Sequence, residues 1–191
     1  MKKPVLNGLF YKEGNLFLML ELDELTLYPL NAEEFSLWIN ELPVLEKKFG
    51  WQYCAEPMEG IFKDVVQAQL IQAMADAPGN WLWYTFWFIV RKADNKIIGS
   101  LVFKGCPSAN GGDVEIGYGL GKEFEHKGYM TKSVKALCDW AKKQPDVKRI
   151  IAETEADGFA SQRLLQRCGF SLFKKDSVST WWELPLTFVD C

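Results

Sequence analysis

The chain has 191 residues, a formal net charge of −3 at pH 7, 48% hydrophobic residues and 25% charged residues, which suits one globular domain with a sizeable core. The acidic balance gives no reason to expect a nucleic-acid partner, and no apolar run is long enough to cross a membrane. Five cysteines without a C-x-x-C spacing and a single histidine predict no disulfide framework, no metal site and a reduced, cytoplasmic protein.

The first 22 residues are predicted to form an N-terminal extension. Turn signals at Asn7-Gly8 and Gly14-Asn15 flank two short apolar runs that could pair as an extra hairpin. The remainder, 23–191, is predicted to be a single domain, because no internal repeat or low-complexity tract divides it.

The domain opens with an alternating strand pattern at 25–30, and a helix follows that begins after the N-cap Asn31 and stops before Pro43. Residues 49–57 are aromatic and irregular. Helical spacing of apolar residues predicts further helices over 59–76, from 129 onward and over 157–168. Apolar runs with strand character predict strands over 81–90, 97–103, 114–120, 149–153, 170–174 and 178–184.

The stretch 114–131 is the most informative part of the chain. A strand over 114–120 leads into a polar loop, and Gly128 stands where the next helix should begin. The N–H groups at such a helix start lack partners, and the helix dipole favours an anion there. We expect the pyrophosphate of a nucleotide-type cofactor at this position. Residues 121–149 carry eight Lys/Arg against four Asp/Glu, which indicates either a solvated helix face or a basic collar around a polyphosphate.

The stretch is neither a Walker A loop nor a G-x-G-x-x-G fingerprint. Glu125-His-Lys-Gly128-Tyr-Met130 resembles the Gln/Arg-x-x-Gly-x-Gly/Ala acetyl-CoA signature of the GNAT superfamily of N-acetyltransferases, and departs from it at Glu125 and Met130. Arg167-Cys-Gly-Phe170 resembles the end of that family's last helix. The segment 25–30 and Glu115-Ile-Gly-Tyr118 resemble the branch that contains the ribosomal-protein alanine N-acetyltransferases. The order of elements agrees with the family from about 25 to 186.

This resemblance implies an α/β (α+β) GNAT fold, with a mixed, mostly antiparallel central sheet of about seven strands, splayed at its middle and flanked by about four helices. It implies transfer of the acetyl group of acetyl-CoA to a primary amine by direct attack in a ternary complex. The amine is a protein N-terminus or a small molecule, and the protein is a monomer or homodimer. The alternative is a non-catalytic acyl-CoA-binding module with the same fold.

The resemblance also implies the cofactor site. The backbone of three strand residues would pair with the pantetheine arm as an added strand does: Ile116, Tyr118 and Leu120. The phosphates would meet the backbone at the start of the helix: His126, Lys127, Gly128, Tyr129 and Met130. Ser161 would hydrogen-bond the cofactor or be an ordinary residue of a first helical turn.

For catalysis, Glu115 is the first candidate for the general base, with Glu153 and Glu155 as alternatives. Glu115 could instead be an ordinary solvent-facing glutamate. Gly117 is expected to leave open space beside Glu115 for an amine or a water. Ser161 is the remaining catalytic candidate. Leu165 stands where many relatives have the tyrosine that protonates the leaving thiolate, and Gly158 stands where the branch has an asparagine.

Overall fold

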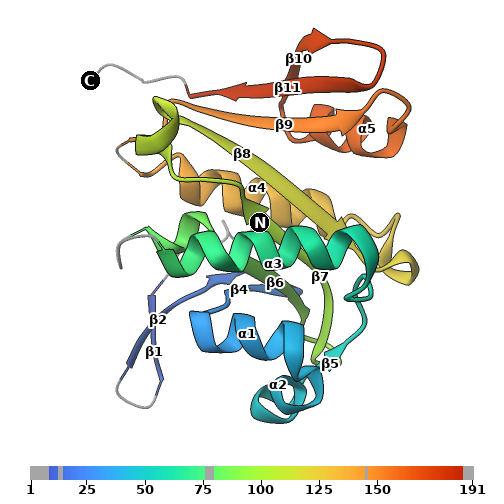
Figure 1. Ribbon diagram of the computed structural model, residues 1–191. Helices are drawn as coiled ribbons and strands as arrows, with labels where there is room; N and C mark the ends of the chain where they lie inside the picture. Colours follow the sequence, from blue (N-terminus) through green and yellow to red (C-terminus); the bar gives the residue numbers. More distant parts are fainter. Residues whose placement is uncertain (1–8, 13–14, 76–79, 145, 187–191) are drawn as a thin grey trace.

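The computed structural model describes residues 9–12, 15–75, 80–144 and 146–186 (Figure 1). In this part of the chain a nine-stranded sheet has the order β10-β11-β9-β8-β7-β6-β4-β3, and β5 pairs with β7. The strands of this sheet are β3 (Leu20–Glu21), β4 (Leu25–Pro29), β5 (Gln52–Tyr53), β6 (Phe86–Arg91), β7 (Lys96–Phe103), β8 (Asp113–Leu120), β9 (Arg149–Glu155), β10 (Ser171–Lys175) and β11 (Ser179–Pro185). The helices are α1 (Ala32–Asn40), α2 (Leu42–Phe49), α3 (Gly60–Ala75), α4 (Tyr129–Ala141) and α5 (Phe159–Arg167).

Most neighbouring strands of the sheet run antiparallel, and two pairs run parallel: β5 with β7, and β8 with β9. The fold class predicted from the sequence is therefore confirmed, with more strands and one more helix than expected. Among the described helices, none is long and apolar enough to cross a bilayer.

Two strands lie outside the main sheet. β1 (Leu9–Lys12) pairs antiparallel with β2 (Asn15–Leu18). The proposed turn at Asn7-Gly8 and the glycine of Gly14-Asn15 lie outside the described residues. The division of the chain into an extension over 1–22 and a domain over 23–191 stays a prediction.

The pairing of β8 with β9 is short. It covers Asp113 with Arg149, Val114 with Ile150 and Glu115 with Ile151, although β8 continues to Leu120 and β9 to Glu155. Figure 1 shows the two strands diverging beyond this point, with α5 beside the wider end. The splay expected at the middle of the sheet is present, and it leaves one edge of β8 without a neighbouring strand.

Both faces of the sheet are covered, and β6 shows how. Phe86, Phe88 and Val90 belong to the apolar cluster that contains Phe35 and Trp38 of α1. Trp87 and Ile89 belong to the other cluster, which contains the apolar face of α4 and Leu165 of α5. Because successive strand residues point to opposite faces, the apolar run over 86–90 is covered on both sides, and β6 lies inside the sheet between β4 and β7, as the sequence predicted.

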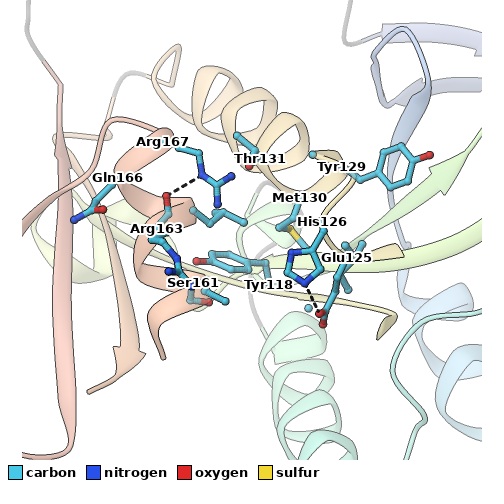
Figure 2. Close-up of a pocket in the computed structure, with 15 residues that line it drawn as sticks. Tyr118, Glu125, His126, Tyr129, Met130, Thr131, Ser161, Arg163, Gln166 and Arg167 are labelled. Atoms are coloured by element: carbon cyan, nitrogen blue, oxygen red, sulfur yellow. Dashed lines mark hydrogen bonds and ion pairs between the residues drawn. The ribbon is translucent and has the colours of Figure 1, made fainter. Parts of the chain in front are cut away.

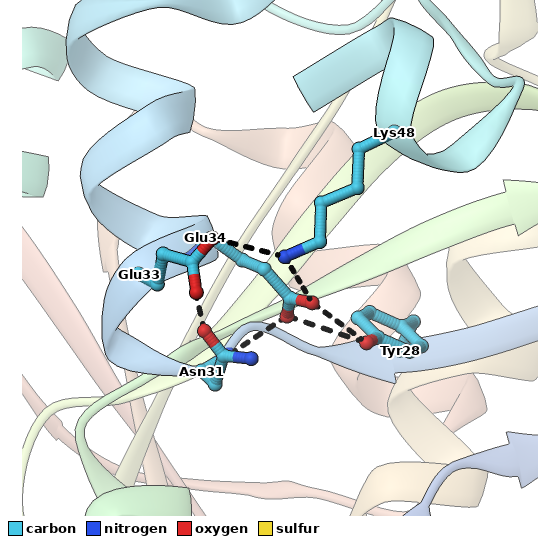
Figure 3. A network of polar contacts seen from close by, with 5 residues as sticks. All are labelled: Tyr28, Asn31, Glu33, Glu34 and Lys48. Atoms are coloured by element: carbon cyan, nitrogen blue, oxygen red, sulfur yellow. Dashed lines mark hydrogen bonds and ion pairs between the residues drawn. The ribbon is translucent and has the colours of Figure 1, made fainter. Parts of the chain in front are cut away.

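The start of α1 is fixed by a polar network around the buried Glu34 (Figure 3). The Glu34 N–H donates to Asn31 Oδ1 at 2.9 Å, and the Asn31 N–H donates back to the Glu34 carboxylate at 3.0 Å, which is a capping box. The Tyr28 hydroxyl donates to the Glu34 carboxylate at 3.1 Å, and Lys48 Nζ lies 3.5 Å from Glu34 Oε1. Asn31 is thus confirmed as the N-cap. Burial, together with the neighbouring Glu34 charge, raises the pKa of Tyr28.

The first helix stops before Pro43, as predicted, and ends at Asn40; Pro43 itself occupies the first turn of α2, where its missing N–H costs no hydrogen bond. One local prediction was wrong. The segment Trp81–Trp83 forms a 3₁₀ turn and is not part of the following strand. The alternation of large side chains in this segment is typical of a strand. The segment is nevertheless a turn, in which Trp83 packs on Phe103 and Trp140.

Candidate functional site

The gap beside β8 opens into a cavity of about 870 Å³ (Figure 2). The end of β8, the loop that follows it, the first turn of α4 and one side of α5 line this cavity. Seven of the residues predicted for the cofactor site are among the lining residues: Tyr118, Leu120, His126, Gly128, Tyr129, Met130 and Ser161. Ile116 is buried in the core, and Lys127 is exposed and donates to the Glu123 carbonyl; neither lines the cavity.

The first turn of α4 presents free donors to this cavity. Gly128 is the N-cap, with φ at 79° and no side-chain cap, and the first backbone bond of the helix runs from the Lys132 N–H to the Gly128 carbonyl. The N–H groups of Tyr129, Met130 and Thr131 therefore have no intrahelical acceptor. Together with the helix dipole, they favour an anion at this place.

The free edge of β8 faces the same gap. The Glu115 carbonyl accepts from the Lys104 N–H at 2.9 Å, and the Gly121 N–H donates to the Ile98 carbonyl at 2.8 Å, so both point toward β7. Because the direction alternates along the strand, the backbone N–H and C=O groups of Ile116, Tyr118 and Leu120 point away from β7. Past the last β8–β9 pair, this edge can accept an extended ligand as an added strand.

The Tyr118 hydroxyl is buried in the wall of the cavity and has no hydrogen-bond partner among the described residues. In Figure 2 its ring points toward α5 and Ser161. Burial raises the pKa of Tyr118 to about 12, and the nearby Ser161 hydroxyl opposes part of this rise. The two hydroxyls do not meet the geometry of a hydrogen bond, so an unsatisfied polar group faces the cavity. Leu165 is fully buried in the core and supplies no hydroxyl.

Sequence reasoning missed two cationic side chains, Arg163 and Arg167, on the side of α5 that lines the cavity. The Arg167 Nε–H donates to the Arg163 carbonyl at 3.1 Å, and neither guanidinium forms an ion pair with a carboxylate of the described residues. Figure 2 shows them across the cavity from the start of α4. The spacing of four residues between the two arginines, on the helix that also carries Ser161, is the signal that could have revealed them.

Glu125 also lines the cavity. Its carboxylate lies 3.8 Å from the His126 imidazole nitrogen Nε2, and His126 adopts a left-handed φ of 60°. Glu125 is the lining residue that carries a negative charge, on the side of the cavity opposite the two arginines (Figure 2).

Glu115 lies on the other face of β8, and it does not line the cavity. Its carboxylate forms an ion pair with Lys104, and the two side chains are 28% and 48% exposed. A Cβ atom at Gly117 would lie 3.6 Å from Lys104 Cε and 3.3 Å from Val102 Cγ1. The expectation of open space beside Glu115 was therefore wrong, because Lys104 reaches across Gly117 from the neighbouring strand. Glu153 and Glu155 are exposed on β9.

Comparison with known proteins agrees with this geometry. The acetyltransferase (GNAT) domain family matches residues 24–171. The N-acetyltransferase YjdG of Bacillus subtilis is 36% identical over 96 residues, which are 50% of this chain and 56% of YjdG. The N-acetyltransferase p20 of Bacillus licheniformis is 33% identical over 110 residues, 57% of this chain and 61% of p20. Each match thus spans less than two thirds of the relative's length.

Among solved structures, the ribosomal-protein-S5-alanine acetyltransferase from Vibrio fischeri superposes with a TM-score of 0.62 at 17% identity, over 90% of this chain and 98% of that one. The microcin C7 self-immunity acetyltransferase MccE, in complex with acetyl-CoA and AMP, gives 0.56 at 24% identity, over 86% and 93%. At these identities the likeness shows a shared fold.

Proposed function

This chain belongs to the GNAT acetyltransferase family, and we propose that it transfers the acetyl group of acetyl-CoA to a primary amine by direct attack in a ternary complex. The observation that carries the proposal is the cavity in which the free edge of β8 and the uncapped start of α4 face the same space. An acyl-CoA has an extended amide-containing arm and a pyrophosphate, which suit these two features.

In the proposed complex, the pantetheine arm follows the backbone of Ile116, Tyr118 and Leu120. The pyrophosphate accepts hydrogen bonds from the N–H groups at the start of α4, beside His126 and Gly128. Lys127 is exposed nearby and contributes charge. Arg163 and Arg167 face the same cavity and add the positive charge that a nucleotide with several phosphates requires.

The chemistry needs few groups. The lone pair of a neutral amine forms a C–N bond at the thioester carbonyl, the C–S bond breaks, and its electron pair leaves on sulfur. The ammonium proton passes to a base. Glu115 is the base proposed from the sequence, and the Tyr118 and Ser161 hydroxyls are donors that can hydrogen-bond the bound ligand from the cavity wall.

The acceptor is proposed to be either a protein N-terminus or a small-molecule amine. The structural relative from Vibrio fischeri is named for a ribosomal-protein alanine, which supports the first class. A second candidate function, an acyl-CoA-binding module without catalysis, is favoured by Leu165 and Gly158, which bring no polar side chain to the cavity.

The test is release of free thiol from acetyl-CoA across a panel of small amines and N-terminal peptides, beside a calorimetric titration of acetyl-CoA without amine. We expect binding in the absence of amine, and thiol release that depends on at least one acceptor. Binding without thiol release from any acceptor would favour the binding module. Failure to bind acetyl-CoA would contradict both candidates.

A further inference from the structure

A second carboxylate reaches the free part of β8 from the face opposite the cavity. A Cβ atom at Gly119 would lie 3.3 Å from Oε2 of Glu56, which belongs to the segment between β5 and α3. Glu115 and Gly117 point to this same face, because residues 115, 117 and 119 alternate with those that point to α4 and α5. Glu56 therefore stands over the stretch of β8 whose edge is free.

The backbone around Glu56 is held in place. Tyr53 pairs with Ile97 of β7, and the Cys54 N–H donates to the Ile97 carbonyl at 2.8 Å. The Tyr53 hydroxyl donates to the Glu56 carbonyl at 2.7 Å. The segment thus crosses over the end of β8, held by contacts on the N-terminal side of Glu56 and at the Glu56 carbonyl.

Glycine at position 121 makes this crossing possible. A Cβ atom there would overlap the Cys54 carbonyl oxygen and would lie 3.3 Å from Ala55 Cα. Any larger residue would push the segment away from β8 and lift Glu56 off Gly119. The position of Glu56 therefore follows from a close backbone approach that only glycine allows.

The two carboxylates on this face differ in their partners. Glu115 is ion-paired with Lys104, whereas Glu56 forms no ion pair with a lysine or arginine among the described residues. Glu56 is exposed, and its charge is felt locally, since it contributes to raising the pKa of Tyr53 after the larger effect of burial. Glu56 is thus a carboxylate open to an incoming cation.

We propose that Glu56 receives the acceptor amine and removes its proton. This proposal rests on the proposed function, because the thioester must lie along the free edge of β8. A primary amine arrives as an ammonium ion, which the Glu56 carboxylate attracts through opposite charge. One N–H proton passes to a carboxylate oxygen of Glu56, which later returns it to water. The neutral amine then attacks the thioester carbonyl, and the C–S bond breaks with its electron pair on sulfur. The nitrogen of the new C–N bond loses its second proton, which protonates the leaving thiolate.

The position of Glu56 also defines the acceptor class. The acceptor must reach β8 from the face of Glu56 and Gly119, with its amine charged in solution and its remainder outside toward α3. Lys104 and Glu115 neutralise each other beside it. The paired Glu115 then acts as a positioning residue that holds Lys104 over Gly117, and Glu56 is the group that touches the amine.

The test compares three matched substitutions in the full chain: Glu56→Gln, Glu115→Gln and Glu59→Gln. Glu59 is an exposed glutamate three residues along the same segment and serves as the control. With the best acceptor, Glu56→Gln should lower kcat/KM about 100-fold near neutral pH. The dissociation constant of acetyl-CoA should change less than about twofold, because the acceptor face does not hold the cofactor.

The pH profile separates a base from a structural residue. The loss in Glu56→Gln should shrink as pH rises, because more of the amine is then already neutral. The inference would be overturned if Glu56→Gln lowered kcat/KM by less than about threefold, or if it weakened acetyl-CoA binding as much as it lowered kcat/KM. Loss confined to Glu115→Gln would overturn it too and would return the base to Glu115, with the proposed function intact. Absence of turnover in the unsubstituted chain would contradict both the role of Glu56 and the proposed acetyl transfer.

Discussion

Tyr28 and Tyr118 are both shielded tyrosines, but their hydroxyl groups meet different surroundings. The Tyr28 hydroxyl donates to Glu34 inside the network of Figure 3. The Tyr118 hydroxyl has no partner in the described part of the chain and faces the cavity. A buried polar group without a partner costs stability, unless a ligand or a water satisfies it.

Replacement of each tyrosine by phenylalanine separates these cases. Tyr118→Phe should leave the free energy of unfolding of the ligand-free protein unchanged or raise it by about 1 kcal/mol, because an unsatisfied hydroxyl is removed. Tyr28→Phe should lower it by about 2 kcal/mol, because a bond to a charged group is lost. Urea unfolding at a constant m-value measures both. A clear destabilisation by Tyr118→Phe would show that its hydroxyl is already satisfied.

At this scale the sequence predicts which face a side chain takes, but not what reaches it from elsewhere. Alternation along β8 placed Glu115 and Gly117 together, as the structure has them. The ion pair with Lys104 depends on the register of β7 against β8, and the approach of Glu56 depends on a segment about 60 residues earlier in the chain. No local pattern carries either contact, so both the filled space at Gly117 and the second carboxylate were missed.

Helix starts were the elements best predicted from sequence. Local chemistry marks the starts of α1 and α4: Asn31 caps α1 with its side chain, and Gly128 precedes α4 with a left-handed φ. The short elements α2, β5 and the turn at Trp81–Trp83 were missed, because tertiary contacts outweigh their weak local patterns. The cavity itself follows from the register at which β8 and β9 stop pairing, which no periodicity encodes.

The arginine pair of α5 gives a prediction for that helix. Replacement of Arg163 and Arg167 together by glutamine should weaken acetyl-CoA binding about tenfold, or 1.4 kcal/mol, because the nucleotide phosphates lose two cations. The loss should be larger at low ionic strength, where exposed charges are less screened. Calorimetric titration at two salt concentrations measures it.

The charge-matched control is the replacement of Lys142 and Lys143 by glutamine at the far end of α4, outside the residues that line the cavity. This variant should bind acetyl-CoA as the unsubstituted chain does. An equal loss in both variants would mean that net charge, and not the position of the arginines, sets the affinity.

For the whole molecule, the decisive feature is that β8 borders the cavity on one side and carries the candidate acceptor site on the other. The free edge of β8 opens toward the cavity between α4 and α5, while Glu115, Gly117 and Gly119 lie on its other face, where Glu56 approaches Gly119. A donor and an acceptor can therefore approach the same strand from opposite faces of the sheet without competing for space. This arrangement is consistent with the proposed direct transfer in a ternary complex.

We propose that acetyl-CoA binds with its pyrophosphate at the start of α4, and a calorimetric titration of acetyl-CoA into the Gly128→Asp variant is the sharpest test of this placement. Gly50→Asp is the matched control. Gly50 ends α2 and Gly128 precedes α4, but both have a left-handed φ, of 67° and 79°, and neither has atoms within 4 Å of an added Cβ. Both variants therefore place a side chain on a left-handed residue and add the same charge. We predict one binding site in the unsubstituted chain, unchanged affinity in Gly50→Asp, and affinity at least about tenfold weaker in Gly128→Asp. Unchanged affinity in a folded Gly128→Asp variant would show that the pyrophosphate does not bind at the start of α4.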